Sequence, residues 1–204
     1  SNVRGPCERG LVSVVLPTFN GERFLAEAIE SVLNQSHERL ELIVVNDGST
    51  DATPTIVDRY VARDPRVRSI RQTNQKLPRA LNAGFAVARG EFLTWTSDDN
   101  VMGRRFLESM IDVLNAKPHV DMVYTDYELI DAEGRPGHNS PFCAEIQNPP
   151  GSGRIRLPRD VSMLNLVKGN YIGPAFLYRE RVRLLIGDYD PRYYTCEDYD
   201  YFLR

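Results

Sequence analysis

Several features that mark common protein classes are missing from this 204-residue chain. No apolar run approaches the roughly 18 residues needed to cross a bilayer, and the start of the chain carries no signal-peptide pattern. The formal net charge is -3, whereas a general nucleic-acid binder usually shows a basic excess or a basic stripe. We therefore expect no transmembrane segment in this chain and no nucleic-acid partner.

Cysteine is scarce, and two familiar phosphate-binding motifs are absent. Cys7, Cys143 and Cys196 are widely spaced and lack zinc-ligand spacing, which suits a reducing compartment. We expect a cytoplasmic protein, peripheral at the membrane in a longer native chain. There is no Gly-x-Gly-x-x-Gly after the first apolar run and no Gly-Lys-Ser/Thr loop. A dinucleotide dehydrogenase and a P-loop enzyme are therefore disfavoured.

What is present is the pattern of one α/β domain. A chain of this length with 42% hydrophobic residues can bury a full core. Strand-like apolar runs alternate with helical spacing four times, with short connections, the strands lying at 12–16, 42–45, 67–70 and 92–95. This alternation predicts a Rossmann-like, mostly parallel sheet with helices on both faces.

The ends of the chain and its second half are less regular. Residues 1–10 read as a tail or cloning remnant, and a fifth strand is expected at 120–125. The Gly- and Pro-rich stretch 127–160 reads as a long loop, of the kind that often forms a lid or a binding segment. A short helix at 161–167, an extended stretch at 171–178 and another helix at 181–186 follow.

Residues 91–100 place two adjacent carboxylates, Asp98 and Asp99, just past the strand 92–95. In open α/β sheets, ligands bind outside the carboxyl ends of the strands. Repulsion between neighbouring acids is relieved best by a cation or a hydrogen-bond donor. The pair therefore favours a ligand site, with a solvated loop or a helix N-cap before Met102 as the alternative.

The second strand ends in Asn-Asp-Gly-Ser-Thr-Asp at 46–51. A hydroxyl of its Ser-Thr pair can cap the following helix, which leaves Asp47 to accept from a ligand N–H or hydroxyl. Asn20 is the expected cap of the first helix. Lys76 and Arg79 are the cations placed to meet a diphosphate, although solvated surface cations are an equally weighted interpretation.

Three acids occur near the C-terminal end, in Thr-Cys-Glu-Asp-Tyr-Asp at 195–200. Acids at a helix start are favoured by the macrodipole, so this pattern alone does not require catalysis. The helix that opens here is cut off at Arg204, and we expect the chain to be truncated at its C-terminus.

Together, these segments resemble the inverting nucleotide-sugar glycosyltransferases of family two, which have the A-type glycosyltransferase fold. The resemblance runs from Leu11 to Arg204 and implies a single catalytic domain at 11–204, with a nucleotide-binding half at 11–126 and an acceptor-binding half at 127–204. It rests on Val-Val-Leu-Pro-Thr-Phe-Asn at 14–20, Leu-Ile-Val-Val-Asn-Asp-Gly-Ser-Thr-Asp at 42–51, Ala-Leu-Asn-Ala-Gly-Phe at 80–85, Ala-Arg-Gly-Glu-Phe-Leu at 88–93, Ser-Asp-Asp at 97–99, Ile-Gly-Asp-Tyr-Asp at 186–190 and Glu-Asp-Tyr-Asp at 197–200.

The resemblance implies a nucleotide pocket. Pro17, Thr18 and Asn20 would line it, and Asp47 would bind the base or ribose, most often of a uridine nucleotide. Arg79 falls on the nucleotide or diphosphate side. The implied donor is therefore a nucleoside-diphosphate sugar, most often a UDP-sugar.

The resemblance also implies a metal site and a base. Asp98 falls on the last acid of the family's Asp-x-Asp motif, which holds Mn²⁺ or Mg²⁺ against the nucleotide diphosphate, and Asp99 stands beside it. Asp198 falls on the catalytic base, with Glu197 adjacent. Thr96 replaces the first acid of the motif. Many relatives add a metal-binding His beyond the Glu-Asp motif, whereas every His of this chain precedes it: His37, His119 and His138.

The implied reaction is transfer of the sugar, with inversion, to a hydroxyl of a glycan or lipid-linked acceptor in polysaccharide or cell-surface glycan synthesis. Asp198 would take the acceptor proton while the metal offsets charge on the departing diphosphate. A nucleotide-sugar-binding module impaired in catalysis is the alternative, favoured by Thr96. A sugar nucleotidyltransferase shares the fold type, but it should open with a Gly-rich, Arg-containing loop rather than Pro-Thr-Phe-Asn.

Overall fold

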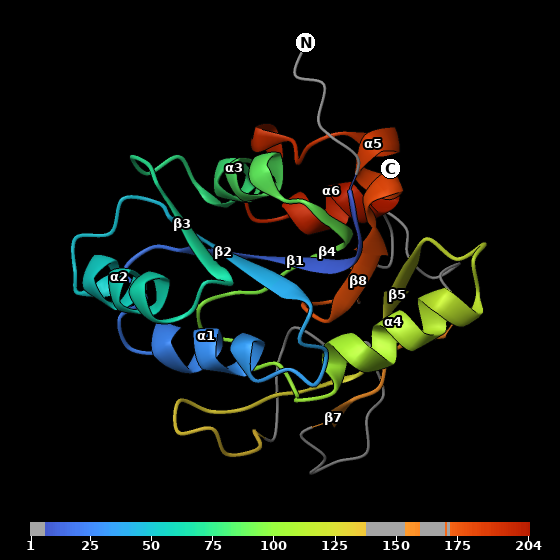
Figure 1. The fold of residues 1–204 in the computed structure, drawn as a ribbon, viewed down its shortest axis with the longest axis horizontal. Helices are drawn as coiled ribbons and strands as arrows, with labels where there is room; N and C mark the ends of the chain where they lie inside the picture. The colour runs from blue at the N-terminus through green and yellow to red at the C-terminus, as the bar shows by residue number, and fades with distance from the viewer. Residues whose placement is uncertain (1–6, 138–153, 160–169, 171) are drawn as a thin grey trace.

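A computed structural model describes residues 7–137, 154–159, 170 and 172–204. Figure 1 shows a central sheet flanked by helices. In chain order the elements are β1 (Glu8–Thr18), α1 (Leu25–Leu33), β2 (Leu40–Asn46), α2 (Thr53–Arg63), β3 (Val67–Arg71), α3 (Leu77–Val87), β4 (Gly90–Trp95), α4 (Phe106–Ala116), β5 (Met122–Tyr124), β6 (Tyr127–Glu128), β7 (Arg154–Ile155), β8 (Phe176–Arg179), α5 (Glu180–Ile186), η3 (Pro191–Tyr193) and α6 (Glu197–Leu203).

The central sheet has six strands in the order β3-β2-β1-β4-β8-β5. The first four are mutually parallel, and β8 runs antiparallel between β4 and β5. The predicted α/β class and the mostly parallel sheet are confirmed. The chain moves outward from β1 to β3 and then returns to the other side of β1, so the strand order reverses between β1 and β4. Ligands of open α/β sheets bind beside such a reversal.

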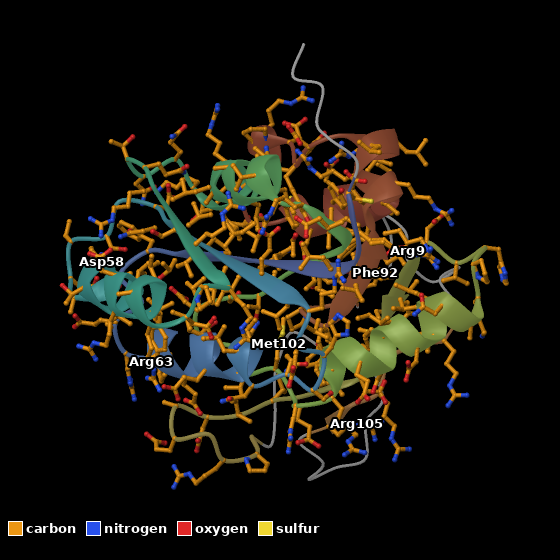
Figure 2. All side chains as sticks on the ribbon, viewed as in Figure 1. Arg9, Asp58, Arg63, Phe92, Met102 and Arg105 are labelled. Carbon is orange, nitrogen blue, oxygen red and sulfur yellow. The ribbon has the colours of Figure 1, made fainter. Side chains whose placement is uncertain are left out.

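The two faces of the sheet are covered by different helices, as expected. Helices α1, α2 and α4 bury apolar residues with Val14 and Phe92 on one face, while α3, α5 and α6 pack with Val15 on the other. Figure 2 places Phe92 inside the molecule, whereas Asp58 and Arg63 of α2 lie on its outer surface. Alternate residues of each buried strand therefore serve opposite cores.

The prediction of a tail over residues 1–10 is wrong for its last three residues, because β1 already begins at Glu8. The Glu8 N–H donates to the Arg89 carbonyl at 2.7 Å, and the Gly10 N–H donates to Glu91 Oε2 at 2.7 Å. Residues 1–6 lie outside the described residues. The two backbone N–H groups are satisfied by the chain around the start of β4, so the strand extends past the apolar run that predicted it.

The expected helix caps are also wrong. Helix α1 begins at Leu25, beyond reach of an Asn20 cap, and α2 begins at Thr53 without a cap from the Ser-Thr pair at 49–50. Helix α4 begins at Phe106, so neither acid of the pair at 98–99 caps a helix at Met102. Asn20 and Ser49 instead join the loops after β1 and β2, where the Asn20 N–H donates to Ser49 Oγ at 2.9 Å.

The second half contains short elements that the composition did not predict. Strand β6 pairs antiparallel with β7, both inside the stretch expected to be a long loop. Residues 138–153 of that stretch, the helix expected at 161–167 and the start of the extended segment at 171 lie outside the described residues. The helix predicted at 181–186 is confirmed as α5. Among the described helices, none combines the length and apolar character needed to cross a bilayer.

Candidate functional site

The carboxyl ends of β1 and β4 lie side by side and bring Thr18 against Asp98. The Thr18 hydroxyl donates to Asp98 Oδ2 at 2.5 Å. Gly21 packs directly against this pair. A Cβ at this position would clash, because it would lie 2.2 Å from Asp98 Oδ2 and 2.6 Å from Thr18 Oγ1. The sequence reasoning did not single out Gly21. Its lack of a side chain allows the turn after β1 to pass directly over the acid.

The two adjacent acids have different surroundings. Burial raises the pKa of Asp98, the hydrogen bond from Thr18 opposes that rise, and the charge of Asp99 adds to it. Asp99 is exposed, and within the described residues its carboxylate forms no hydrogen bond. One oxygen of Asp98 thus already accepts a hydrogen bond within the protein, while Asp99 faces solvent.

This pair fits a divalent cation of the Mg²⁺ or Mn²⁺ type. Such ions are bound through one or two carboxylates together with substrate phosphates, so a complete protein cage is not needed. In the part of the chain that the structure describes, no group of three or more His, Cys, Asp or Glu side chains is arranged to hold an ion by itself. A cation at Asp98 and Asp99 would therefore complete its coordination with a ligand and water.

Asp47, at the end of β2, is buried and already hydrogen-bonded. Its Oδ1 accepts from Gln72 Nε2 at 2.7 Å and from the Gln75 N–H at 2.8 Å, and its Oδ2 accepts from the Lys76 N–H at 2.9 Å. Its own N–H donates to the Thr18 carbonyl at 2.9 Å. A carboxylate offers about four acceptor positions, so one remains for a ligand. The contacts in place shape the loop after β3.

The other predicted nucleotide-side residues, Pro17, Asn20 and Arg79, lie in different surroundings. Asn20 adopts φ 56°, and its Oδ1 accepts from the Thr50 N–H at 2.8 Å. Pro17 is buried in β1, whereas Arg79 is exposed on α3. The structure joins Thr18, Asp47 and Asp98 directly, with Asn20 beside them bridging to the loop after β2. Among the described residues, Arg79 forms no hydrogen bond to this group.

The acids expected at a helix start do begin α6 at Glu197. Asp198 Oδ2 accepts from Asn170 Nδ2 at 2.9 Å, and burial raises the pKa of Asp198 against the lowering effect of its donors. Glu197 is 5% exposed, and its pKa is raised by burial and by the charge of Asp198. Asp200 is paired with Arg204 at 2.9 Å. Asp198 is therefore the acid that combines a fixed orientation with a raised pKa.

Asn82 positions this second group and was missed by the sequence reasoning. Its Nδ2 donates to the Tyr189 carbonyl at 2.8 Å, and its Oδ1 accepts from the Tyr189 N–H at 2.9 Å. The Tyr189 ring stacks on Tyr201 of α6 with centroids 4.2 Å apart. Asn is a weak helix former, and its occurrence inside α3 was the available signal. Through this contact α3 fixes the chain that leads into α6.

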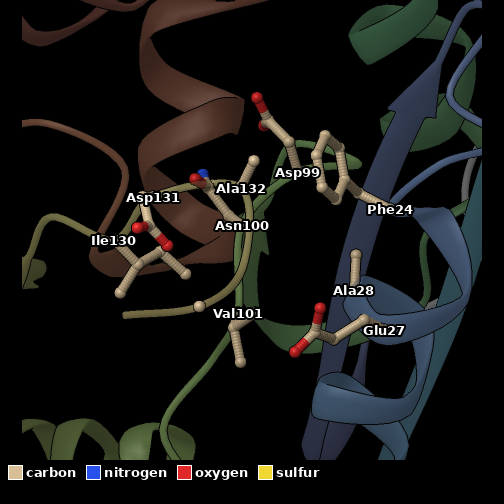
Figure 3. Close-up of a pocket in the computed structure, with 10 residues that line it drawn as sticks. Phe24, Glu27, Ala28, Asp99, Asn100, Val101, Ile130, Asp131 and Ala132 are labelled. Atoms are coloured by element: carbon tan, nitrogen blue, oxygen red, sulfur yellow. The ribbon is translucent and has the colours of Figure 1, made fainter. Parts of the chain in front are cut away.

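A cavity of about 210 Å³ lies beside Asp99. Figure 3 shows Phe24 and Glu27 on one side of it and Asp99, Asn100 and Asp131 around the rest. Asp131 belongs to the stretch expected to be a long loop over the site. Part of that stretch therefore lines the same cavity as Asp99, a proximity that the sequence pattern could not locate.

The relatives found among known sequences are glycosyltransferases. The family model described as glycosyl transferase family 2 matches residues 13–183. An uncharacterized glycosyltransferase of Rickettsia prowazekii (strain Madrid E) is 31% identical over 195 residues, covering 95% of this chain and 58% of the relative. Glycosyltransferase GlyG of Streptococcus pneumoniae serotype 4 is 35% identical over 122 residues, covering 59% and 40%. The chain thus spans less than two thirds of the length of these relatives.

Comparison with solved structures supports the fold. TarS of S. aureus covers 93% of this chain and 32% of its own, with a TM-score of 0.71 and 20% identity. The mannosyltransferase PcManGT from Pyrobaculum calidifontis, in complex with GDP-Man and Mn²⁺, covers 88% and 47%, with a TM-score of 0.61 and 21% identity. At these identities the likeness establishes the fold alone. Because the family model spans most of the chain, and the sheet has the expected parallel core, this chain belongs to glycosyl transferase family 2.

Proposed function

We propose that this domain transfers a sugar, with inversion, from a UDP-sugar to a hydroxyl of a glycan or lipid-linked acceptor. The observation that carries the proposal is the hydrogen-bonded contact of Thr18, Asp47 and Asp98 at the strand-order reversal. Family membership supports sugar transfer as the reaction type. The cell-surface polysaccharide context follows from the sequence resemblance and is part of the proposal.

The donor would lie across the carboxyl ends of β1, β2 and β4. Pro17, Thr18 and Asn20 line the first loop, and Asp47 fixes the loop after β3 with one acceptor position left for the base or ribose. A uridine nucleotide is supported by a structural neighbour, TarS residues 1–349, solved in complex with UDP and with UDP-GlcNAc. The diphosphate would then face Asp98 and Asp99.

Asp98 and Asp99 would hold Mn²⁺ or Mg²⁺, which when bound would offset the charge of the diphosphate leaving group. The Mn²⁺ in the complex of the structural neighbour PcManGT supports this choice. Thr96, where the resemblance places the first acid of the motif, is 2% exposed. The two carboxylates that follow it therefore carry the metal role in this chain.

Asp198 would act as the general base. It accepts the proton of the acceptor hydroxyl while that oxygen forms a bond to the anomeric carbon. The bond between the anomeric carbon and the diphosphate oxygen breaks, and the nucleoside diphosphate leaves with the electron pair. Attack opposite the leaving group inverts the anomeric centre, and no covalent nucleophile is needed. A base with a pKa raised by burial is a stronger proton acceptor once ionised, and Asn170 orients its carboxylate.

Calorimetric titration with UDP, GDP and a panel of nucleotide sugars, with Mn²⁺ or with EDTA, tests the donor assignment. We expect UDP to bind more tightly with Mn²⁺. Equal affinity in EDTA and in Mn²⁺ would remove the metal role, and no binding of any nucleotide would overturn the proposal.

A donor-hydrolysis and transfer assay on the same protein tests catalysis. Release of sugar from the preferred donor is expected. Tight donor binding without release or transfer would instead support the impaired binding module, which the replacement at Thr96 favours.

A further inference from the structure

Lys76 holds a backbone conformation that a lysine rarely adopts. It lies at the start of α3 with φ 72° and ψ 165°. This region is populated almost only by glycine, and a side chain held there costs folding free energy. Strained residues of this kind gather at functional sites, so the outlier motivates a search for what the side chain gains.

The surrounding structure holds Lys76 in place through Asp47. Asp47 Oδ2 accepts from the Lys76 N–H at 2.9 Å, while Oδ1 accepts from the Gln75 N–H and the Gln72 side chain. Asp47 in turn donates its own N–H to the Thr18 carbonyl. The strained lysine is therefore fixed by the carboxylate of a buried residue whose backbone N–H contacts the β1 end of the candidate donor site.

The Lys76 side chain contacts a residue from the C-terminal part of the chain, Tyr194. Its Nζ lies 5.9 Å from the centroid of the Tyr194 ring, within the range of a cation–π contact. Tyr194 precedes Thr195, which has φ 79°, and α6 begins two residues after Thr195. The ammonium group therefore lies beside the segment that leads into α6, the helix that contains Asp198.

The candidate site contains Asp98, Asp99 and Asp198, so the phosphates of a nucleotide need positive charge there. We propose that Lys76 is a donor-binding residue whose ammonium contacts the phosphate groups of the nucleoside-diphosphate sugar. This inference rests on the proposed function and adds a donor-binding residue to it. If position 76 served only to shape the backbone, its positive φ would favour glycine.

The test compares Lys76→Gly with Lys76→Met in the full chain, with UDP and uridine as probes. Lys76→Met keeps the strained backbone and the aliphatic stem but removes the charge. It should weaken UDP binding about tenfold or more, the usual effect of losing a charged hydrogen bond, and leave uridine affinity within twofold. Lys76→Gly should weaken UDP binding similarly and raise Tm by roughly 2–4 °C, because the strain is relieved.

The outcomes separate this inference from the proposed function. UDP affinity unchanged in Lys76→Met overturns the inference while leaving the proposed function intact. An equal loss of UDP and uridine affinity also overturns it, because the side chain would then act on the nucleoside pocket. A wild-type chain that binds no UDP with Mn²⁺ present overturns both.

Discussion

At the amino ends of the parallel strands lies a buried acid, Glu41, whose negative charge is stabilised by several hydrogen-bond donors. Glu41 is 2% exposed and accepts from the Ser13 hydroxyl at 2.6 Å, the Arg89 N–H at 2.8 Å and Arg68 Nη1 at 3.0 Å. Burial alone would raise the pKa of Glu41, but these donors together lower it. The acid links β1, β2, β3 and the start of β4.

Three other acids show the opposite balance: Asp98, just past the end of β4, and Glu197 and Asp198, at the start of α6. Burial raises the pKa of Asp98, Glu197 and Asp198, and the donors that face them do not compensate it. One oxygen of Glu197 has no hydrogen-bond partner among the described residues. Acids that are left under-compensated in the folded protein keep their capacity for a ligand, a proton or a cation.

Burial therefore does not by itself assign a role to a carboxylate. A compensated acid stabilises the fold, whereas an under-compensated one lowers stability and is retained for chemistry. The two classes should therefore respond in opposite ways to the same change, loss of the charge at constant shape. The following predictions start with the largest expected effect.

Asp198→Asn tests the functional end. It preserves shape but removes the proton acceptor, so turnover should fall by roughly 10²–10⁴-fold, the usual worth of general-base catalysis. UDP affinity should change little, because the carboxylates expected to face the diphosphate are Asp98 and Asp99. Steady-state kinetics on a full-length active protein, with Asp200→Asn as the matched control, measures this. Normal turnover with lost UDP binding would place Asp198 in the donor site and move the search for a base to Glu197 or Asp200.

Glu41→Gln tests the structural end. Loss of a charged acceptor facing several donors should lower the free energy of unfolding by about 2 kcal/mol, with kcat unchanged. Because the folded pKa of Glu41 is lowered, its contribution is present above its unfolded pKa and is lost as pH falls through the folded pKa. The gap between variant and wild type should thus close in acid.

Urea unfolding at neutral and acidic pH measures this difference. Glu108→Gln is the control, because Glu108 forms an exposed pair with Arg105 that should contribute little. An equal effect of both variants would mean that the Glu41 network adds no stability.

Asp98→Asn should show the opposite sign in stability. The raised pKa means that the ionised folded form is disfavoured, so stability falls as pH rises from the unfolded pKa to the folded pKa. At neutral pH the variant should be at least as stable as wild type by thermal melting. Mn²⁺-supported UDP binding should weaken about tenfold, and more than in Asp99→Asn. The reverse order would place the ion on the exposed acid of the pair.

Asn170→Ala should give the smallest effect, a shift in pH dependence. The Asn170 amide stabilises ionised Asp198, so its removal should move the acid limb of the kcat profile upward by about one pH unit. In the wild type this limb should already lie above 3.8, the ordinary value for the side chain, because burial raises the pKa of Asp198. Loss of activity without any shift of the limb would assign Asn170 to substrate contact instead.

The sequence by itself predicted the strands and helices of the first half of the chain and the family. Apolar runs and helical spacing located β1 to β4 and the helices between them, because burial of one face imposes a local period. The position of Asp98 and Asp99 just past an apolar run predicted an acidic pair at the carboxyl end of a strand, which is β4. The ordered motifs pointed to the family that the comparisons establish.

Only the tertiary structure decided which distant residues meet. Thr18 and Asp98 are 80 positions apart, and their contact follows from the adjacency of β1 and β4 rather than from either local pattern. The same holds for the antiparallel insertion of β8, the approach of Gly21 to Asp98, and the anchoring of Tyr189 by Asn82. Local sequence determines the spacing of apolar residues in each helix or strand. Which distant residues form hydrogen bonds across the sheet depends on the order of the strands. The caps were mispredicted for this reason: polar side chains such as Asn20 found partners in neighbouring loops instead of in their own helix.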